Sequence, residues 1–337
     1  MKAHKIVVIP GDGIGPEIMS ATLMVLEKLD CGLEFTKAAA GQEALEQSGN
    51  LLPPRTLGLI EEHRVSLKGP LTTPIGGGFS SLNVSLRQHF DLYANLRPVA
   101  SIPGARSRYE DIDIITVREN TEGLYSGEHD EISEDGDRAE ILGVVTKKGS
   151  DRILRFAYEI ARKRGRGMVT VVHKANILKA TSGLFLDRSR EIRRDYPEIQ
   201  TREMIVDNAS MQLVLNPHQF DVIVTTNLFG DILSDLCAGL IGGLGLAPGA
   251  NIGEEAAIFE AVHGSAPDIA GKGIANPTAL MLAAALMLDH LGLDSPASRL
   301  RHAIRETLAD GRRSTADLGG SATTREYAEA IAWRLSE

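Results

Sequence analysis

Cysteine, aromatic residues and long apolar runs are all scarce in this chain of 337 residues. Its two cysteines, Cys31 and Cys237, are too few for a disulfide framework, and we interpret both as reduced. The longest apolar run, residues 279–288, would span about half of a membrane. The N-terminal residues match neither a signal peptide nor a transit peptide. We therefore predict a soluble, cytoplasmic protein with no membrane partner.

Positive charge is also in deficit, since 36 Lys and Arg residues face 45 Asp and Glu residues, for a net charge of −9. This balance argues against nucleic acid or an anionic membrane as a partner. An anionic substrate would need its own local cluster of cations.

The regular pattern in the chain is an alternation of short β-branched runs with longer amphipathic stretches. Because strand–helix alternation is typical of a sheet covered by helices, the sequence predicts an α/β fold. The predicted strands are 5–9, 113–117, 168–173, 203–207 and 221–226, and the predicted helices include 16–29, 150–165 and 276–292.

The glycine loop at 11–16 raises the question of a dinucleotide fingerprint. Its order is Gly-Asp-Gly-Ile-Gly-Pro, so the third glycine comes one residue early and a proline follows it. Asp12 would also repel a pyrophosphate. We interpret the segment as a tight strand-to-helix turn, with any dinucleotide contacts lying mainly elsewhere.

An acidic segment at 126–149 interrupts the alternation and ends in the β-like run 141–145. We expect a solvated loop or hairpin here. A strand pair of this kind could also add to the sheet of a partner.

Three arginines, Arg87, Arg97 and Arg118, lie in strand-to-loop contexts. Guanidinium groups bind carboxylates through two parallel hydrogen bonds, so the set favours a substrate with several carboxylates, although any one arginine alone is as well explained by a surface salt bridge. Ser81 and Asn83 precede Arg87, and Asn83 shares its helix face. Tyr125 follows Arg118 by seven residues.

Asp231 and Asp235 stand at i and i+4 on a predicted helix within 227–245. Two acids on one face repel each other unless a cation lies between them, and a hard divalent metal fits. Asp207, which ends the predicted strand 203–207, is a plausible third ligand. Solvated acids or capping residues explain this spacing equally well.

Two further segments carry candidate site residues. Lys174 and Asn176 follow the predicted strand 168–173, and a lysine beside a metal would have a lowered pKa and could act as a base. The loop 259–277 is rich in small residues that permit close approach of a planar ligand. It contains His263, Asp268 and Asn276.

Taken together, the motifs resemble those of the β-decarboxylating dehydrogenases, which act on isocitrate, homoisocitrate or 3-isopropylmalate. The resemblance runs from "GDGIGPE" (11–17) through "NLFGDILSD" (227–235), "GGLGLAPGANIG" (242–253) and "HGSAPDIAGKGIANP" (263–277) to "DLGG" (317–320). Among these enzymes the chain is most similar to NAD-dependent isocitrate dehydrogenases.

The resemblance implies an α/β fold without a Rossmann domain. It implies a large cofactor-binding domain from 1–92 and 242–337, a small domain from 93–122 and 147–241, and a clasp at 123–146 that joins a homodimer. Two subunits would build each active site.

The resemblance also assigns a role to each site residue. Arg87, Arg97 and Arg118 would bind substrate carboxylates, Tyr125 would be the general acid, and Lys174 of the second subunit the general base. Asp231 and Asp235, with Asp207 of the second subunit, would bind Mg²⁺ or Mn²⁺. Asn176 would align substrate and nicotinamide, and Thr72 and Thr73 would lie near the nicotinamide. The adenosine of NAD would lie against the loop containing His263, Gly264, Ala266, Asp268, Ile269 and Asn276.

Two specificities follow. Asp268 with Ile269 is similar to NAD-using relatives, because a carboxylate accepts hydrogen bonds from ribose hydroxyls but repels a 2′-phosphate. Ser81 and Asn83 suit the third carboxylate of isocitrate. In the segment that corresponds to residues 80–87, the resemblance implies a Glu-x-x-Leu-x-x-Leu-Arg pattern for isopropylmalate dehydrogenases. It implies an arginine-rich segment for homoisocitrate dehydrogenases. Homoisocitrate or isopropylmalate as substrate, and a regulatory subunit of a hetero-oligomeric isocitrate dehydrogenase, remain the alternatives.

Overall fold

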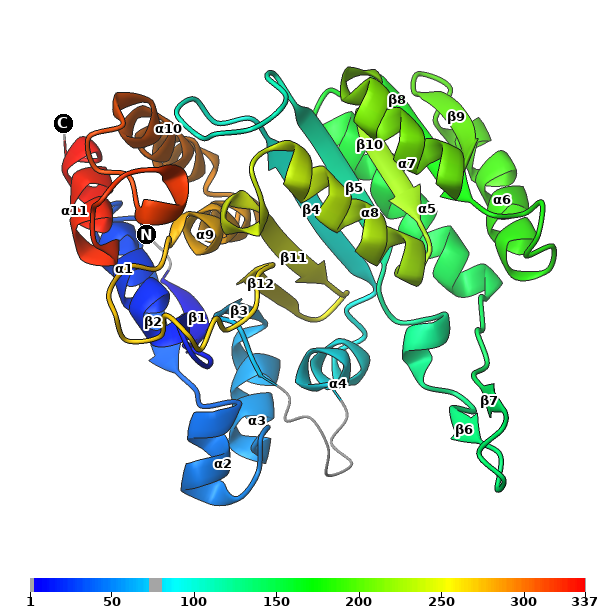
Figure 1. Ribbon diagram of the computed structural model, residues 1–337, viewed down its shortest axis with the longest axis horizontal. Helices are drawn as coiled ribbons and strands as arrows, with labels where there is room; N and C mark the ends of the chain where they lie inside the picture. Colours follow the sequence, from blue (N-terminus) through cyan, green and yellow to red (C-terminus); the bar gives the residue numbers. More distant parts are fainter. Residues whose placement is uncertain (1–2, 73–80, 337) are drawn as a thin grey trace.

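The computed structural model describes residues 3–72 and 81–336, and within these ranges one ten-stranded sheet runs the length of the molecule (Figure 1). Its strand order is β2-β1-β3-β12-β11-β4-β5-β10-β8-β9. The strands are β1 (His4–Ile9), β2 (Leu33–Lys37), β3 (Val65–Lys68), β4 (Ala94–Ala100), β5 (Asp113–Glu119), β8 (Met168–His173), β9 (Gln200–Ile205), β10 (Val222–Thr225), β11 (Pro248–Ile252) and β12 (Ala257–Ala261).

The two ends of the sheet are parallel, and its middle is antiparallel. Strand β11 pairs antiparallel with both β12 and β4, and β4 pairs antiparallel with β5. A doubly wound dinucleotide-binding sheet has a parallel order 3-2-1-4-5-6, which this arrangement does not share. The predicted α/β fold without a Rossmann domain is confirmed.

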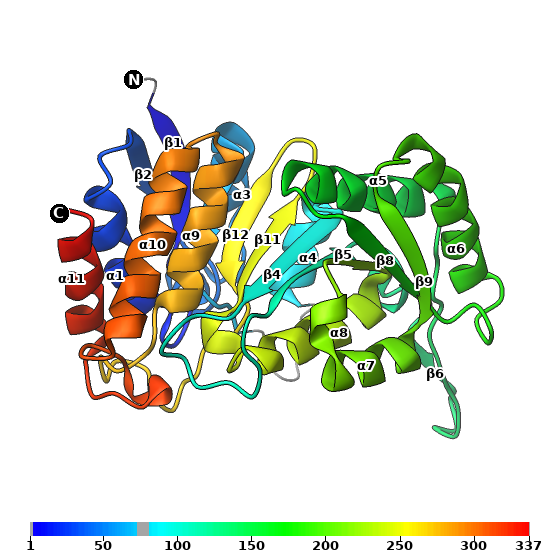
Figure 2. The same cartoon turned by 90° about the horizontal axis from the view of Figure 1, so that it is seen from above.

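Helices cover both faces of the sheet. Figure 2 shows α5, α9 and α10 on one face and α7 and α8 on the other. The helices are α1 (Gly15–Glu27), α2 (Gln42–Ser48), α3 (Pro54–His63), α4 (Leu82–His89), α5 (Lys147–Lys163), α6 (Thr181–Ile192), α7 (Val206–Leu215), α8 (Asn227–Leu240), α9 (Thr278–His290), α10 (Asp294–Asp310) and α11 (Thr324–Arg334). Their apolar sides form the main core, and no helix in the described residues is long and apolar enough to cross a membrane.

The glycine loop before α1 is a turn held by Asp12. The Asp12 carboxylate accepts hydrogen bonds from the backbone N–H groups of Gln42 (2.8 Å) and Thr72 (2.7 Å). Gly13 has a positive φ of 58°, and a Cβ there would lie 2.0 Å from the carbonyl oxygen of Ser265. The loop therefore binds its own chain, in agreement with its interpretation as a turn.

Three local expectations differ from the structure. Strand β9 ends at Ile205, and Asp207 lies in the first turn of α7. Strand β5 continues to Glu119, so Arg118 lies within the strand, not after it. The acidic segment forms a small exposed hairpin of β6 (Glu131–Ile132) and β7 (Ala139–Glu140), as expected, but of the β-like run 141–145 only Val144 pairs as a strand residue, with Gly123.

Candidate functional site

A cluster of arginines and carboxylates forms where β4, β5 and α8 meet. Alternation along the strands turns Arg97 of β4 and Arg118 of β5 to the face covered by α8. Gly230 of α8 allows the close approach, since a Cβ there would lie 2.5 Å from Cγ of Arg118. The fold thus brings together two predicted arginines and the helix that carries both predicted aspartates.

Arg118 is held from several sides. Its Nε and Nη2 donate to Oδ1 of Asn227 at 3.0 and 2.7 Å, and its Nη1 donates to Asp231. Only 1% of its side chain is exposed. Burial, and then the neighbouring Arg87, lower the pKa of Arg118 to about 10, so it stays charged at neutral pH. One fixed cation therefore faces the site.

Tyr125 shares Asp231 with Arg118. The Tyr125 hydroxyl donates to Oδ2 of Asp231 at 2.5 Å, and the guanidinium of Arg118 lies 5.1 Å from the centre of the tyrosine ring. Burial and then the hydrogen bond to Asp231 raise the pKa of Tyr125. The phenol keeps its proton at neutral pH, which is the state that a general acid requires.

The two aspartates of α8 differ in charge environment. Burial by itself would raise the pKa of Asp231, but Arg118 and the Tyr125 hydrogen bond outweigh it and lower the pKa. Burial, and the charge of Asp231, raise the pKa of Asp235, against the opposing effect of Arg97 at 3.9 Å. A cation beside Asp235 would relieve this unfavourable charge.

A buried polar network that the sequence did not single out supports the arginines. Glu260 of β12 accepts from Nζ of Lys68 at 2.6 Å and from Nδ2 of Asn251 at 2.6 Å, and it lies 3.9 Å from Arg87. Burial would raise the pKa of Glu260, but Lys68 first and Arg87 next lower it to about 2. Asn95 joins the network by donating from Nδ2 to Oδ1 of Asn251 at 2.8 Å, and it accepts from Nε of Arg97 at 2.8 Å. The sequence feature that could have indicated this network is the presence of two charged residues, Lys68 and Glu260, within mainly apolar strands.

Two polar side chains at the start of α4, those of Ser81 and Asn83, make no hydrogen bond that caps the helix within the part of the chain that the structure describes. Ser81 precedes the helix without a side-chain capping hydrogen bond. Oδ1 of Asn83 is buried and has no hydrogen-bond partner in the described residues, and Asn83 lies beside Lys68, Arg87 and Glu260. Neither side chain is therefore committed to the helix itself.

Lys174 and Asp207 form a second, separate pair. Nζ of Lys174 donates to Oδ1 of Asp207 at 2.8 Å, and Asp207 is exposed. The hydrogen bond from Lys174 lowers the pKa of Asp207. Asn176 is exposed in the loop after β8. Within residues 3–72 and 81–336, no hydrogen bond or ion pair joins this pair to the arginine cluster, and no group of three possible metal ligands forms.

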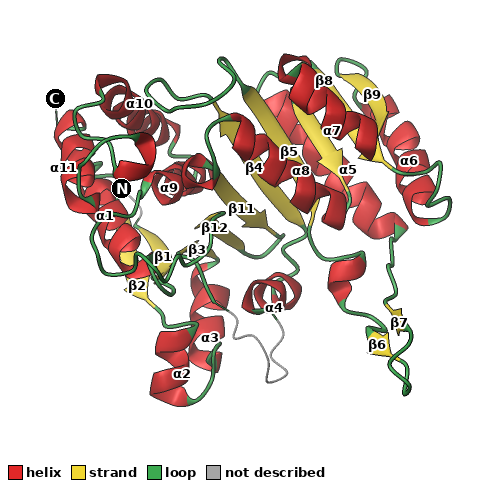
Figure 3. Ribbon diagram, viewed as in Figure 1, coloured by secondary structure: helices red, strands yellow, loops and turns green. Residues whose placement is uncertain are grey.

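The loop 262–277 joins β12 to α9 (Figure 3). A cavity of about 560 Å³ lies beside this loop. His263, Gly264, Ala266, Ile269 and Asn276 of the predicted set line it. So do residues that the sequence reasoning missed, including Ile14, Ala275 and Asp317. Asp268 is exposed and does not line the cavity.

Some polar groups at this cavity are held by hydrogen bonds within the chain, and one has no partner among the described residues. Nδ2 of Asn276 donates to Asp317 at 2.9 Å, and Oδ1 of Asn276 accepts from Thr278. Nε2 of His263 is buried without a partner in the described chain, and burial lowers the pKa of His263, so the ring is neutral at pH 7. The Thr72 hydroxyl bonds to Ser265 at 2.7 Å. Thr73 lies outside the described residues.

The sequence and the structure were each compared with known proteins. The sequence model described as "Isocitrate/isopropylmalate dehydrogenase" matches residues 5–331. An isocitrate dehydrogenase [NAD] catalytic subunit from Arabidopsis thaliana is 49% identical over 324 residues, covering 96% of this chain and 86% of that protein. A 3-isopropylmalate dehydrogenase from Archaeoglobus fulgidus is 50% identical over 328 residues, covering 97% and 98%.

The fold agrees with these matches. The crystal structure of isocitrate dehydrogenase from Methylococcus capsulatus superposes with a TM-score of 0.95 at 54% identity, covering 99% of this chain and 100% of that one. Matches of this extent show common descent over essentially the whole described chain. This protein therefore belongs to the isocitrate/isopropylmalate dehydrogenase family.

Proposed function

We propose that the protein catalyses the NAD-dependent oxidative decarboxylation of isocitrate to 2-oxoglutarate and CO₂. The observation that carries the choice of substrate is the side-chain amide of Asn83, which makes no hydrogen bond in the described residues and lies one helical turn before Arg87. An isopropyl group placed there would leave the amide unsatisfied, at a cost of about 1–3 kcal/mol. A third carboxylate can instead accept from the amide N–H₂ of Asn83 and from the Ser81 hydroxyl.

The remaining carboxylates of the substrate bind the arginine cluster. Arg87, Arg97 and Arg118 supply rigid forks whose orientation is set by their own buried partners, so little side-chain entropy is lost on binding. Tyr125 holds the proton that C3 of the product receives once CO₂ has left. Its hydrogen bond to Asp231 keeps the phenol at the edge of the cluster.

The general base comes from a second copy of the chain, which makes the enzyme a homodimer with shared sites. Support comes from α7, where Asp207 shares an exposed helix face with Met211 and Leu215. Ile232, next to Asp231 on α8, is 56% exposed. A second copy that covers these apolar side chains brings residues beside Asp231. Lys174 of that copy takes the hydroxyl proton of the substrate, and Asn176 aligns the substrate with the nicotinamide.

Asp231 and Asp235 of α8, together with Asp207 of the second copy, fit a divalent cation. Neither α8 aspartate can hold such a cation alone. Asp235 has a raised pKa and is repelled by Asp231 one turn away. With Asp207 of the second copy, they supply the hard oxygen ligands that Mg²⁺ and Mn²⁺ take. When bound, such an ion supplies a Lewis acid for the ketone oxygen and for the charge left by decarboxylation.

The cavity beside α9 fits the adenosine of NAD. Its lining is mainly apolar with a few fixed polar groups, as is usual for a site that binds a small molecule. NAD supplies the hydride acceptor. Asp268 stands at the exposed edge of this region, where it accepts from ribose hydroxyls and repels a 2′-phosphate, and Thr72 lies on the nicotinamide side.

Two other substrates and a non-catalytic role remain to be tested against this proposal. The 50% identity to a 3-isopropylmalate dehydrogenase favours that substrate as the second candidate. Homoisocitrate differs by one methylene, which a pocket distinguishes by only about 1–3 kcal/mol. A regulatory subunit is expected to lack catalytic groups, whereas this chain retains three arginines, Tyr125, Lys174 and three aspartates.

The test is initial-rate kinetics of the purified protein with isocitrate, homoisocitrate and 3-isopropylmalate, each with NAD or NADP and with or without Mg²⁺. We expect the highest kcat/KM with isocitrate, NAD and Mg²⁺, and no turnover after exhaustive chelation. A higher kcat/KM with either other acid overturns the substrate assignment. No turnover with any of them favours the regulatory role.

Shared sites are tested by complementation. Lys174→Met and Asp231→Asn variants are expected to be inactive separately. After mixing and exchange of subunits, each heterodimer contains one site with both native residues, so about a quarter of wild-type activity should return. If the mixture stays inactive although exchange is shown by mass spectrometry, both residues act within one chain.

A further inference from the structure

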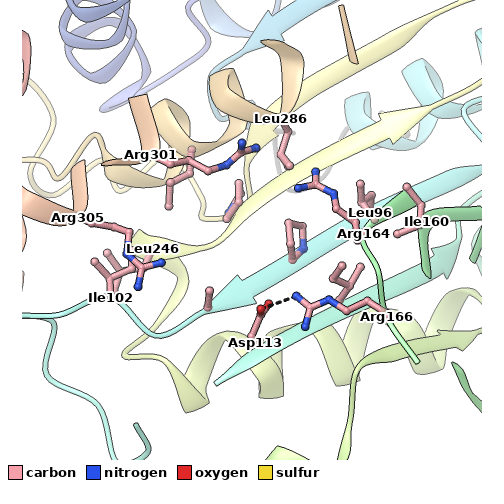
Figure 4. Close-up of a pocket in the computed structure, with 15 residues that line it drawn as sticks. Leu96, Ile102, Asp113, Ile160, Arg164, Arg166, Leu246, Leu286, Arg301 and Arg305 are labelled. Atoms are coloured by element: carbon pink, nitrogen blue, oxygen red, sulfur yellow. Dashed lines mark ion pairs between the residues drawn. The ribbon is translucent and has the colours of Figure 1, made fainter. Parts of the chain in front are cut away.

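A second pocket lies on the face of the sheet opposite the arginine cluster. Strand alternation turns Arg97 and Arg118 to one face, and their neighbours Leu96, Pro98 and Ile115 to the other. These three residues line a cavity of about 230 Å³ and make up its apolar floor. Figure 4 shows the cavity with Leu96 labelled. Its walls are Ile160 of α5 on one side and Leu282 and Leu286 of α9 on the other.

Four arginines surround the apolar floor. Arg164 and Arg166 come from the end of α5 and the turn after it, and Arg301 and Arg305 stand one turn apart on α10. Figure 4 shows all four guanidinium groups around the same space, with Arg166 directed towards Asp113. The pocket therefore joins elements from both sides of β4.

The positive charge of the pocket exceeds its negative charge. Asp289 accepts from Arg164 at 2.8 Å and from Arg301 at 2.5 Å, and Arg166 pairs with Asp113 and lies 4.0 Å from Asp221. These three carboxylates face four guanidinium groups. Arg305 is exposed and has no ion pair or hydrogen bond in the described part of the chain. Such an excess in a protein with a net charge of −9 is a local feature that favours an anion.

We infer that this pocket binds a small organic anion with an apolar body and a phosphate or carboxylate group, at a site separate from the catalytic one. The arginines bind the anionic group through charge-assisted hydrogen bonds. The leucines, Pro98 and the isoleucines bury the body. A cavity of about 150 Å³ holds benzene, so the observed volume fits a single ring with one charged substituent.

Occupancy of the pocket links helices on the two sides of β4. A ligand that bonds to Arg164 and Arg305 together fixes the end of α5 relative to α10. Because β4 and β5 carry Arg97 and Arg118 on their other face, we expect this constraint to reach the arginine cluster. The Michaelis constant for an anionic substrate is the kinetic quantity expected to respond.

The test is calorimetric titration of the purified full chain with phenyl phosphate, with inorganic phosphate and phenol as the separate parts. We expect one site per chain and an affinity at least about tenfold above that of either part. Arg305→Gln should weaken binding about tenfold, the effect of one charge-assisted hydrogen bond. Arg312→Gln, an exposed arginine just beyond α10, is the matched control and should leave the affinity unchanged.

A second variant separates this pocket from the catalytic site. Ala100→Phe fills the cavity from β4 and should abolish binding, while the unfolding transition shows that the protein is folded. If phenyl phosphate binds equally to the Arg305→Gln and Ala100→Phe variants but not to Arg87→Gln, it occupies the catalytic site and the proposal is wrong. Failure of the wild type to bind phenyl phosphate more tightly than inorganic phosphate also overturns it.

Discussion

Replacing Gly230 by alanine tests whether the close packing of α8 on β5 positions Arg118. An added Cβ would lie 2.5 Å from Cγ and 2.6 Å from Cβ of Arg118, and 3.2 Å from its Cα. Carbon atoms in contact need about 3.5–4.0 Å, so helix or side chain must shift by about 1 Å. Arg118 cannot move freely, because Asn227 and Asp231 hold its guanidinium.

The expected cost has two parts. Overpacking destabilises a protein by about 1–3 kcal/mol. The better helix propensity of alanine offsets up to about 1 kcal/mol of this cost. We therefore expect the free energy of unfolding to fall by about 1–2 kcal/mol. A displacement of 1 Å in a substrate-positioning group lowers the rate by about 100-fold. The assays are urea denaturation and kcat/KM for isocitrate.

Gly239 in the same helix provides the control. No atom lies within 4 Å of an added Cβ there, and the residue is exposed. Gly239→Ala should therefore be neutral or stabilise by up to about 1 kcal/mol. If Gly230→Ala behaves like Gly239→Ala, or loses stability while keeping wild-type kcat/KM, the packing of α8 does not position Arg118.

Three other outcomes are expected. Asp268→Lys combined with Ile269→Tyr should shift coenzyme preference from NAD towards NADP, and steady-state kinetics showing wild-type preference for NADP would contradict the argument from charge. Asn83→Ala should lower kcat/KM for isocitrate about tenfold or more with the dissociation constant of NAD unchanged; equal loss for both ligands would indicate a structural role. The lowered pKa of Glu260 contributes stability above its unfolded value near 4.5 that is lost as pH falls towards about 2. The Lys68→Met/Glu260→Gln variant should therefore lose less stability over that range in acid titrations followed by circular dichroism, and an unchanged pH dependence would show that the pair contributes little.

Local pattern predicted the strands that are rich in β-branched residues and the helices with clear periodicity. The run 168–173 matches β8 residue for residue, and the predicted helix 276–292 contains α9. The start of α7 was missed because Ile205 precedes it and no side chain caps it, so the run 203–207 carried a strand pattern with no helix signal. Asp207 was consequently placed on the wrong element.

The sequence predicted some contacts of the site and missed others, because local pattern says little about contacts between elements that are far apart in the chain. Arg97, Arg118, Tyr125, Asp231 and Asp235 meet as expected, because α8 follows directly on β10, beside β5 in the sheet. The sequence showed only that charged residues lie within apolar strands near Glu260; the network itself could not be predicted, since its partners come from β3, β11, β4 and α4 and no local pattern joins them. The predicted division into two domains and a clasp, and the assignment of each site residue, stay predictions.

The pairing of β3 with β12 has a consequence for synthesis of the chain. Val65–Lys68 lies beside Ala257–Ala261, so the first three strands gain this neighbour only after most of the chain has left the ribosome. The strands from β4 to β10 lie within residues 94–225 and can assemble earlier among themselves. The N-terminal segment must therefore wait with an unpaired apolar strand edge, the kind of surface that holding chaperones protect and that aggregates without them.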